Sequence, residues 1–337
     1  MLLHTFKTTN QEHGQTLAAV LRTRLTISWT QARNLISQRQ VRVNGATTTD
    51  PVKRIRGGSR LDVHGHSTVD GRKAPEPRPK SAPNQSPKKT TVLAFPPSVV
   101  YVDDSIIIVD KPPGLTTMRH EEEAAEFGER AKKFLPTTLA DLLPPLIGIA
   151  PRKNAVRPVH RIDRDTSGLV VFARTLKAEE HLNEQFRKHT IERSYLALVR
   201  GVAEAGRIES RIVKDRGDGR RGSTDDPTDG QHAVTHVRIV EALGEFTLIE
   251  CRLETGRTHQ VRIHLGERGT PLCGETVYDR PLNGAPIADT SGCPRTFLHA
   301  FRLGLQHPET LETMRWESPL PNDLDTVLQR LRSEVPT

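Results

Sequence analysis

The sequence predicts an α+β protein in two parts: a small α/β domain, followed by a larger domain built on a mixed, largely antiparallel sheet. Three observations lead to this prediction. Helical and alternating apolar patterns fill residues 1–64, a proline-rich segment without apolar periodicity covers residues 65–91, and short apolar strands with few helices between them occupy residues 92–337. A chain of 337 residues is long enough for both parts.

The small domain begins with two predicted helices. Apolar residues at helical spacing indicate a helix over residues 17–25, and Thr16 is a suitable N-cap for it. Ser28 is expected to cap a second helix that runs through Ala32 to Ile36. The two helices are therefore expected to follow one another after a short connection.

A β-hairpin is predicted next. Residues 41–43 alternate between apolar and polar side chains, and Asn44-Gly45 is typical of a tight two-residue turn. A second turn at Gly57-Gly58 precedes another alternating strand over residues 61–63. The expected order of the small domain is helix, helix, hairpin.

Positive charge is a feature of the whole chain and of its first part in particular. The formal net charge is +8 and the sequence pI is about 9.6, which favours a polyanionic partner such as RNA or DNA. The linker over residues 65–91 places basic residues between prolines and is predicted to be an extended tether. The candidates in the small domain for contacts with phosphate groups are Arg33, Arg39, Arg42, Lys53 and Arg54.

The larger domain is predicted from its apolar runs. An Asp103-Asp104 turn separates two short strands at residues 99–102 and 106–109, and a strand at 169–172 leads into a helix over 178–188. Further strands are expected at residues 195–199, 235–240, 246–253 and 259–265. Two charged segments are predicted to be exposed loops, namely residues 119–136 and 214–232.

Cysteine content and hydropathy indicate the cellular compartment in which the protein is expected. The three cysteines form no CxxC pair, which argues against a disulfide scaffold and favours a reducing environment. The first residues lack the apolar core of a signal peptide, and no stretch approaches the ~20 apolar residues of a membrane span. We therefore expect a cytoplasmic protein, monomeric and without a membrane partner.

The densest group of reactive side chains lies in residues 160–169, HRIDRDTSGL, directly before an apolar strand. The second half of this segment consists of residues that suit a turn or a helix cap. A turn does not explain Arg161 and Asp163, which precede it. These two residues are therefore candidates for chemistry.

The segment HRIDRDTSGLVVFART resembles the signature of the RluA family of pseudouridine synthases. Three other blocks occur in the order that the family has: DSIIIVDKPPGL from Asp104, ERSYLALVRG from Glu192 and LETGRTHQVRIHL from Leu253. The tail FLHA from Phe297, with His307-Pro308, also fits. The resemblance implies a pseudouridine synthase catalytic domain that isomerises uridine to pseudouridine in structured RNA without a cofactor.

The resemblance also implies which residues react. Asp163 is the expected nucleophile, because it follows His-Arg-Ile in the motif, and Asp165 is interpreted as a structural cap. A cation is needed to keep Asp163 ionised in a site that excludes water. Arg262 is the first choice and Arg257 the alternative. On a strand over residues 259–265 the side chains of 257 and 262 would face opposite sides, so one of them at most is expected to meet Asp163.

The resemblance also assigns roles to four residues around the substrate. Tyr195 is expected to pack on the uracil ring and to assist in handling the proton lost from its carbon, with a buried strand aromatic as the alternative. Arg161 is expected to fill the base stack when the uridine is extruded, with a plain phosphate contact as the alternative. His160 and Arg257 are assigned to substrate binding.

The small domain resembles a second family. The stretch TISWTQARNLISQRQVRVNGATTTDPVKRIRGGSRLDV is similar to the S-four RNA-binding domain, named after a protein of the small ribosomal subunit. In pseudouridine synthases such a domain often accompanies large-subunit ribosomal RNA as substrate. Ribosomal RNA is therefore the expected partner, and transfer RNA is the alternative.

Three other functions fit the sequence less well. His259 and His264 could suggest a metal, but no acid or cysteine has matching spacing, so no metal is expected. A hydrolase of nucleosides or glycosides would need a second carboxylate, and Asp165 is too close to Asp163 to lie on the opposite face of a sugar. A non-catalytic ribosome-assembly protein would be favoured had Asp163 been replaced.

Overall fold

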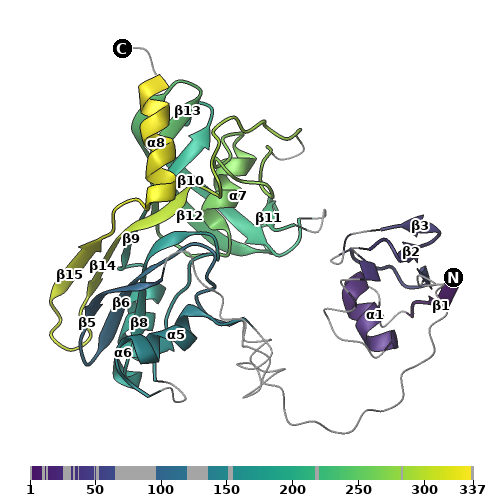
Figure 1. Ribbon diagram of the computed structural model, residues 1–337, viewed down its shortest axis with the longest axis horizontal. Coiled ribbons are helices and arrows are strands. Elements are labelled where there is room, and N and C mark those ends of the chain that lie inside the picture. Colours follow the sequence, from purple (N-terminus) through teal and green to yellow (C-terminus); the bar gives the residue numbers. More distant parts are fainter. Residues whose placement is uncertain are drawn as a thin grey trace, which may run out of the picture. The chain divides into compact units, whose positions relative to one another are not determined.

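The computed structural model describes two compact units, Met1–Lys89 with Gly217–Arg220 and Thr90–Arg216 with Arg221–Thr337 (Figure 1). The proposed linker lies outside the described residues, which are 2–9, 12, 14–25, 32, 35–36, 38–48, 50, 53–64, 96–119, 136–150, 155–216, 220–281 and 284–334.

The first unit contains a four-stranded sheet and a helix. The strands are β1 (Leu2–Lys7), β2 (Val41–Val43), β3 (Ala46–Thr47) and β4 (Arg60–His64), in the order β1-β4-β2-β3. The helix α1 (Leu17–Leu25) confirms the predicted helix, and the hydroxyl of Thr16 accepts a hydrogen bond from the amide of Ala19 at 3.3 Å. Ala32, Leu35 and Ile36 are helical as predicted, whereas Ser28 lies outside the described residues.

The hairpin of the first unit follows the prediction. Asn44 and Gly45 adopt φ angles of 50° and 83°, the left-handed conformation that a tight hairpin turn requires. Strand β1 was not predicted; it completes the sheet by pairing antiparallel with β4. Side chains from α1, β2 and β4 form one apolar core with Ile36 and Ile55. This unit therefore has its own core.

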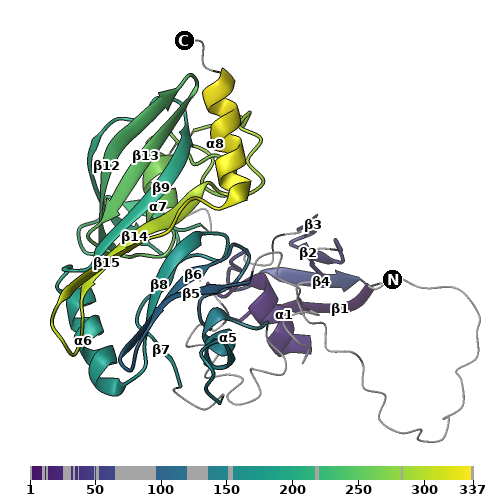
Figure 2. The ribbon, with the colours of Figure 1, turned by 60° about the vertical axis from the view of Figure 1, so that its left-hand side comes forward.

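The second unit is built on an eleven-stranded sheet. Its strands are β5 (Ser98–Val102), β6 (Ile106–Lys111), β7 (Arg157–Pro158), β8 (Ser167–Ala173), β9 (Glu192–Arg200), β10 (Gly206–Val213), β11 (Gly222–Thr224), β12 (Gln231–Leu243), β13 (Phe246–Leu253), β14 (Leu298–Gln306) and β15 (Thr313–Glu317). The order is β11-β10-β12-β13-β9-β14-β8-β6-β5, with β15 beside β14 and β7 beside β8. Figure 2 labels the strands of this sheet from β12 to β5. One pairing, between β14 and β8, is parallel and the others are antiparallel, which confirms the predicted sheet.

Helices cover both faces of this sheet. The alternating side chains of β6 show why its sequence is a continuous apolar run: Ile107 and Val109 belong to one core cluster, and Ile106 and Ile108 to another on the opposite face. Helix α5 (Leu139–Leu146) and helix α7 (Gln260–Glu267) contribute to the first cluster. Helix α6 (Leu176–Arg187) packs in the second, and α8 (Asn322–Glu334) packs in a third beside β9 and β13.

The pairing of β8 with β14 joins two parts of the sheet. It consists of His299 opposite Ser167 and Ala300 opposite Gly168. Gly168 has a φ of 113°, and a Cβ there would lie 2.3 Å from the carbonyl oxygen of Ala300. Glycine is therefore required for this close approach.

The predicted strand over residues 259–265 is wrong, because this segment is the helix α7. The alternation of Val261, Ile263 and Leu265 with polar residues suggested one buried face, yet His264 is buried too, at 1% exposure. The amide of Ile263 donates to the carbonyl of His259 at 2.9 Å, as in a helix. An alternating pattern of only seven residues does not distinguish a strand from a helix when its polar side chains are buried as well.

The two predicted loops differ in outcome. Residues 120–135, most of the first segment, lie outside the described residues. The second segment is in part regular structure, because β11 lies within it and β12 begins at Gln231. No helix in the part of the chain that the structure describes is long and apolar enough to cross a membrane.

Candidate active site

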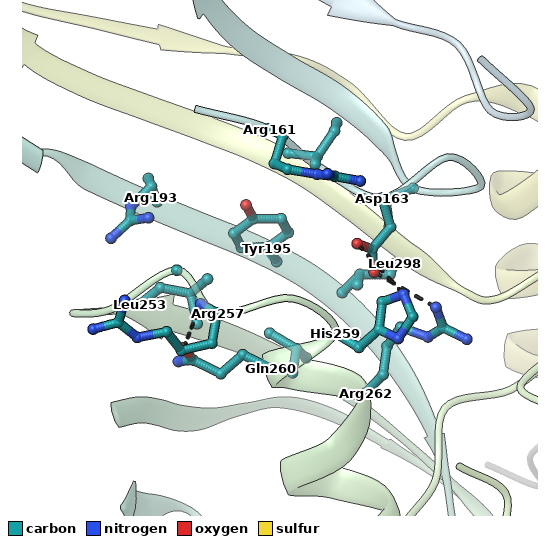
Figure 3. A pocket seen from close by; sticks show the side chains of 14 residues that line it. Arg161, Asp163, Arg193, Tyr195, Leu253, Arg257, His259, Gln260, Arg262 and Leu298 are labelled. Carbon is teal, nitrogen blue, oxygen red and sulfur yellow. Dashed lines mark hydrogen bonds and ion pairs between the residues drawn. The ribbon is translucent and has the colours of Figure 1, made fainter. Parts of the chain in front are cut away.

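A pocket lies where the loop before β8, strand β9 and the start of α7 meet (Figure 3). It encloses about 440 Å³ including its open mouth. Its lining consists of Arg161, Ile162, Asp163, Thr166, Arg193, Tyr195, Leu253, Gly256, Arg257, His259, Gln260, Val261, Arg262 and Leu298. The pocket therefore brings together residues from all three predicted motifs that carry Asp163, Tyr195 and Arg262.

Buried polar contacts hold the loop that carries Asp163. The ammonium of Lys111, fully buried, donates to the carbonyls of Pro112, Leu115 and Arg164 at 2.8, 2.8 and 2.9 Å. Burial lowers the pKa of Lys111 to about 7. The hydroxyl of Thr117 donates to the carbonyl of Ile162 at 2.9 Å, so the backbone on both sides of Asp163 is anchored.

Arg262 faces Asp163 across the pocket. Its Nη1 lies 3.6 Å from Oδ2 of Asp163. The other side of the guanidinium is held by Glu275, with Nε to Oε2 at 2.6 Å and Nη2 to Oε1 at 2.9 Å. One arginine therefore links the candidate nucleophile to a buried carboxylate, and the bidentate pair fixes the plane of the guanidinium.

Glu275 is built into the loop after α7. Its side chain is 0% exposed, and Oε1 also accepts the amides of Thr276 and Val277 at 3.0 and 2.8 Å. Burial opposes ionisation, yet the bonds from Arg262 and from the backbone lower the pKa of Glu275 below its ordinary value. Burial also opposes the charge on Arg262, and Glu275 and Asp163 raise the pKa of Arg262 above its usual range.

His259 completes this end of the pocket. Its Nε2 lies 3.9 Å from Oδ1 of Asp163, and its Nδ1 is 2.8 Å from the hydroxyl of Tyr278. Burial lowers the pKa of His259, although Asp163 opposes the shift. His259 has a φ of 60°, so the chain turns sharply into α7 at this residue and directs Arg262 to the pocket.

Tyr195 lies on β9 between Asp163 and Arg193 (Figure 3). It is buried, at 7% exposure, and its ring lines the pocket. Burial raises the pKa of Tyr195 to about 12, with Arg193 opposing the shift and Asp163 adding to it. The hydroxyl is therefore protonated at neutral pH.

The residues assigned to substrate binding differ in their placement. Arg161 and Arg257 both line the pocket, and Nε of Arg257 donates to the carbonyl of His232 at 3.0 Å. His160 does not line it. Its Nε2 accepts the amide of Val171 at 3.0 Å, and burial lowers its pKa to about 3. This contact gives His160 a structural position, and its role in binding stays a prediction.

Four of the five basic candidates in the first unit are described. Arg39 and Arg42 are exposed, and Arg54 is exposed with its Nη1 donating to the carbonyl of Gly14 at 2.6 Å. Lys53 is half-buried, and Arg33 lies outside the described residues. Their contacts with RNA stay a prediction.

Several residues of the site were not found from the sequence. Glu275 and Tyr278 lie on a loop without apolar periodicity, and Arg193 stands two residues before Tyr195 in the same block. The sequence pattern around His259 suggests only a possible metal ligand and no contact with Asp163. In the part of the chain that the structure describes, no group of three or more His, Cys, Asp or Glu side chains could hold a metal ion.

The chain is similar to known RNA pseudouridine synthases. Residues 105–267 match a family described as RNA pseudouridylate synthase, and residues 16–61 match the S4 domain. The ribosomal large subunit pseudouridine synthase D of Nitrosomonas europaea is 38% identical over 245 residues, 71% of this chain and 67% of the relative. The protein of the same name in Neisseria meningitidis serogroup B is 38% identical over 257 residues, 72% of this chain and 64% of the relative.

The alignments with these two relatives therefore span about two thirds of their length. A longer alignment exists with the uncharacterised RNA pseudouridine synthase YlyB of Bacillus subtilis, 34% identical over 312 residues and covering 90% of each chain. Among solved structures, the human RNA pseudouridylate synthase domain containing 4 has a TM-score of 0.54 at 22% identity, covering 69% of this chain and 92% of that one. This likeness shows a shared fold.

Proposed function

The chain belongs to the RNA pseudouridylate synthase family, and we propose that it converts uridine to pseudouridine in large-subunit ribosomal RNA, with Asp163 as nucleophile and without a cofactor. The observation that carries the proposal is the single pocket in which Asp163, Tyr195 and Arg262 meet. A pseudouridine synthase is an isomerase, because uridine and pseudouridine have the same atoms.

Three features support the substrate class. Relatives at 38% identity are named for the large ribosomal subunit, and the first unit matches the S4 domain. The net charge of +8 favours a polyanion. Ribosomal RNA agrees with all three features.

The reaction breaks the bond between the sugar and N1 of uracil, turns the base, and forms a bond from the sugar to C5. Asp163 supplies the electron pair that begins this exchange, and a covalent route divides one difficult step into two easier ones. Arg262, whose Nη1 lies 3.6 Å from Oδ2 of Asp163, places a positive charge beside the carboxylate and orients it. The proton on C5 is lost, and N1 gains one.

Tyr195 and Arg161 handle the base. The buried ring of Tyr195 gives the uracil a flat surface to pack against while it turns. Because the pKa of Tyr195 is raised to about 12, its hydroxyl acts as a hydrogen-bond donor rather than as an ionised base. Arg161, beside Asp163, fills the space that the extruded uridine leaves in the RNA stack.

Asp163→Asn tests the proposal. Asparagine keeps the size of the side chain and removes its charge, so we expect pseudouridine formation to stop while the fold and the affinity for RNA remain. The purified variant is compared with the wild-type protein in a single-turnover assay on ribosomal RNA from cells that lack the gene. Wild-type turnover by the variant would contradict the assignment of the nucleophile.

A second measurement tests the substrate. Pseudouridines are mapped in total RNA from cells with and without the gene. We expect one or more sites to disappear from large-subunit ribosomal RNA and to return with the wild-type gene but not with Asp163→Asn. Loss confined to transfer RNA would refute the ribosomal substrate, and an unchanged map would refute the proposed activity.

A further inference from the structure

A second hollow opens beside the pocket and shares part of its wall. Both are lined by Arg161, Arg193, Gly256 and Arg257. The second hollow adds Val159, His160, Phe186, Arg187, His189 and Thr255. No carboxylate lines it, so its charged groups are all arginines, and it suits an anionic ligand.

Arg193 is the buried cation on this shared wall. It is 7% exposed, and no carboxylate of the described residues lies within 4.0 Å of it. Its Nη2 donates to the carbonyl of Glu254 at 2.9 Å, and its guanidinium lies over the ring of Phe186 at 5.3 Å. Its Nε is buried without a hydrogen-bond partner. A buried charge left in this condition is costly unless a ligand completes it.

Gly256 leaves the space that the guanidinium of Arg193 occupies. A Cβ at residue 256 would lie 2.6 Å from Nη1 of Arg193. The φ of Gly256 is not in the left-handed region, so the effect of a side chain at this position would be to displace the guanidinium of Arg193 rather than to strain the backbone. The wall therefore leaves room for an arginine that has no carboxylate partner among the described residues.

We propose that Arg193 binds a phosphodiester group of the RNA strand that carries the target uridine, and that the second hollow is the path by which that backbone leaves the pocket. The proposal rests on the proposed function. A phosphodiester is the anion that every nucleotide brings with it, and a guanidinium can bind two of its oxygens. A uracil carbonyl, the other acceptor available, would leave the buried charge uncompensated.

The test measures binding without chemistry. In the Asp163→Asn background, the affinity for ribosomal RNA from cells that lack the gene is measured against salt concentration for Arg193→Gln, Arg193→Lys and Arg238→Gln. Arg238 is an exposed arginine of β12 that pairs with Glu250 outside both hollows, so it is the matched control for loss of one charge.

Loss of one phosphate contact reduces the slope of log affinity against log salt by about one unit. We expect Arg193→Gln to show this reduction and to weaken binding about ten-fold or more. Arg193→Lys should keep the slope, and Arg238→Gln should change neither quantity. An Arg193→Gln protein with the slope of its parent would overturn the proposal and make the arginine purely structural.

A second variant covers the possibility that Arg193→Gln does not fold. Gly256→Ala keeps the charge and displaces the guanidinium, so RNA affinity should fall while the melting temperature stays measurable. Inorganic phosphate is the small probe: it should raise the melting temperature of the parent protein and raise it less in Gly256→Ala. Equal RNA affinity and equal phosphate response in both proteins would refute the proposal.

The outcomes separate this proposal from the activity. If the wild-type protein forms no pseudouridine, the proposed function fails, while the change in salt slope is still measured in the inactive background. If pseudouridine forms but Arg193→Gln binds as its parent does, the activity stands and the phosphate contact fails.

Discussion

At Arg262 one guanidinium contacts two carboxylates of different kinds. Glu275 is completely buried and holds the arginine through two hydrogen bonds, whereas Asp163 is 19% exposed and lies 3.6 Å away on the pocket side. The buried pair therefore fixes the position of the cation, and the open side of that cation faces the carboxylate of Asp163. This division makes Glu275 a positioning residue rather than a catalytic one.

Glu275→Gln tests that division. The amide has similar size but presents a donor to the donors of Arg262, so the arginine should shift away from Asp163. We expect the single-turnover rate to fall about 10²-fold, the loss that a displacement of about 1 Å can cause, with RNA affinity little changed. The control is Asp279→Asn, an acid of the same loop that pairs with Arg280 at 2.7 Å. A wild-type rate in Glu275→Gln would contradict the positioning role.

Two variants of Tyr195 distinguish a stacking role of the ring from a role of the hydroxyl in proton transfer. Tyr195→Phe keeps the ring and removes the hydroxyl, whereas Tyr195→Leu removes both. If the hydroxyl assists proton transfer, the phenylalanine variant should bind RNA normally and react about 10²–10⁴-fold more slowly.

The measurement for Tyr195 is the single-turnover rate beside thermal stability for both variants. An unchanged rate in Tyr195→Phe would remove the hydroxyl from the chemistry. If Tyr195→Leu also kept its rate, the ring would be packing only.

The sequence motifs predicted Asp163, Tyr195 and Arg262, and the structure places all three in one pocket. The sequence could not predict that Glu275 belongs to the site. This acid lies on an irregular loop 13 residues after Arg262, and nothing in the sequence distinguishes it from a surface glutamate. Arg193 was not predicted either, because a basic residue in a strand of a basic chain is expected to be exposed. Burial and partners, which only the fold reveals, distinguish both residues.

At the scale of elements, the segment that became α7 shows the limit of periodicity. Its alternating residues predicted a strand, on which the side chains of residues 257 and 262 would face opposite sides. The segment is instead a helix, which places these two side chains by a different geometry. Of the two arginines, Arg262 approaches Asp163, while Arg257 donates to the carbonyl of His232. The neighbouring strands β6, β8 and β13 were predicted well, because each is an apolar run of ordinary strand length.

His264 links α7 to the sheet and makes stability depend on pH. Its two ring nitrogens lie 2.9 Å from the hydroxyl of Thr235 and 3.0 Å from that of Ser210, and burial lowers its pKa from 6.5 to about 4. Above pH 6.5 the ring is neutral in both the folded and the unfolded chain. Between pH 6.5 and 4 the unfolded chain binds a proton that the folded protein does not, so stability falls as the pH falls.

His264→Gln should therefore flatten the acid side of the stability profile. One such histidine contributes a loss of about 1.4 kcal/mol per pH unit in the free energy of unfolding. We expect the wild-type protein to lose about 2 kcal/mol more than the variant between pH 6.5 and 5, measured by denaturant unfolding. Comparing the two slopes removes any destabilisation that is the same at all pH values. Parallel slopes would show that another group is responsible.

At the scale of the molecule, two compact units carry different predicted tasks. The first unit has its own apolar core and basic candidates for phosphate contact, and the second contains the pocket. The sequence predicted this division from composition, since the proline-rich segment interrupts the periodic patterns on either side of it.

Deletion of residues 1–89 tests the task of the first unit. The second unit keeps all its core clusters and the pocket, so we expect it to fold and to retain single-turnover activity at high RNA concentration. RNA affinity should fall, and the salt slope should decrease by about one unit for each lost phosphate contact. A truncated protein with the full slope would show that the first unit does not contact RNA.

The parallel pairing of β8 with β14 has a consequence for how the enzyme becomes active as it folds. His299 and Ser167 are 132 positions apart, and their side chains hydrogen-bond at 3.0 Å across this pairing. Asp163 lies on the β8 side, whereas Tyr195 comes from β9 on the β14 side. Contacts so distant in the chain carry a large loop-closure cost and tend to form slowly. We therefore expect native-like helices to appear during refolding before any turnover does, because the pocket exists only once the two parts of the sheet have joined.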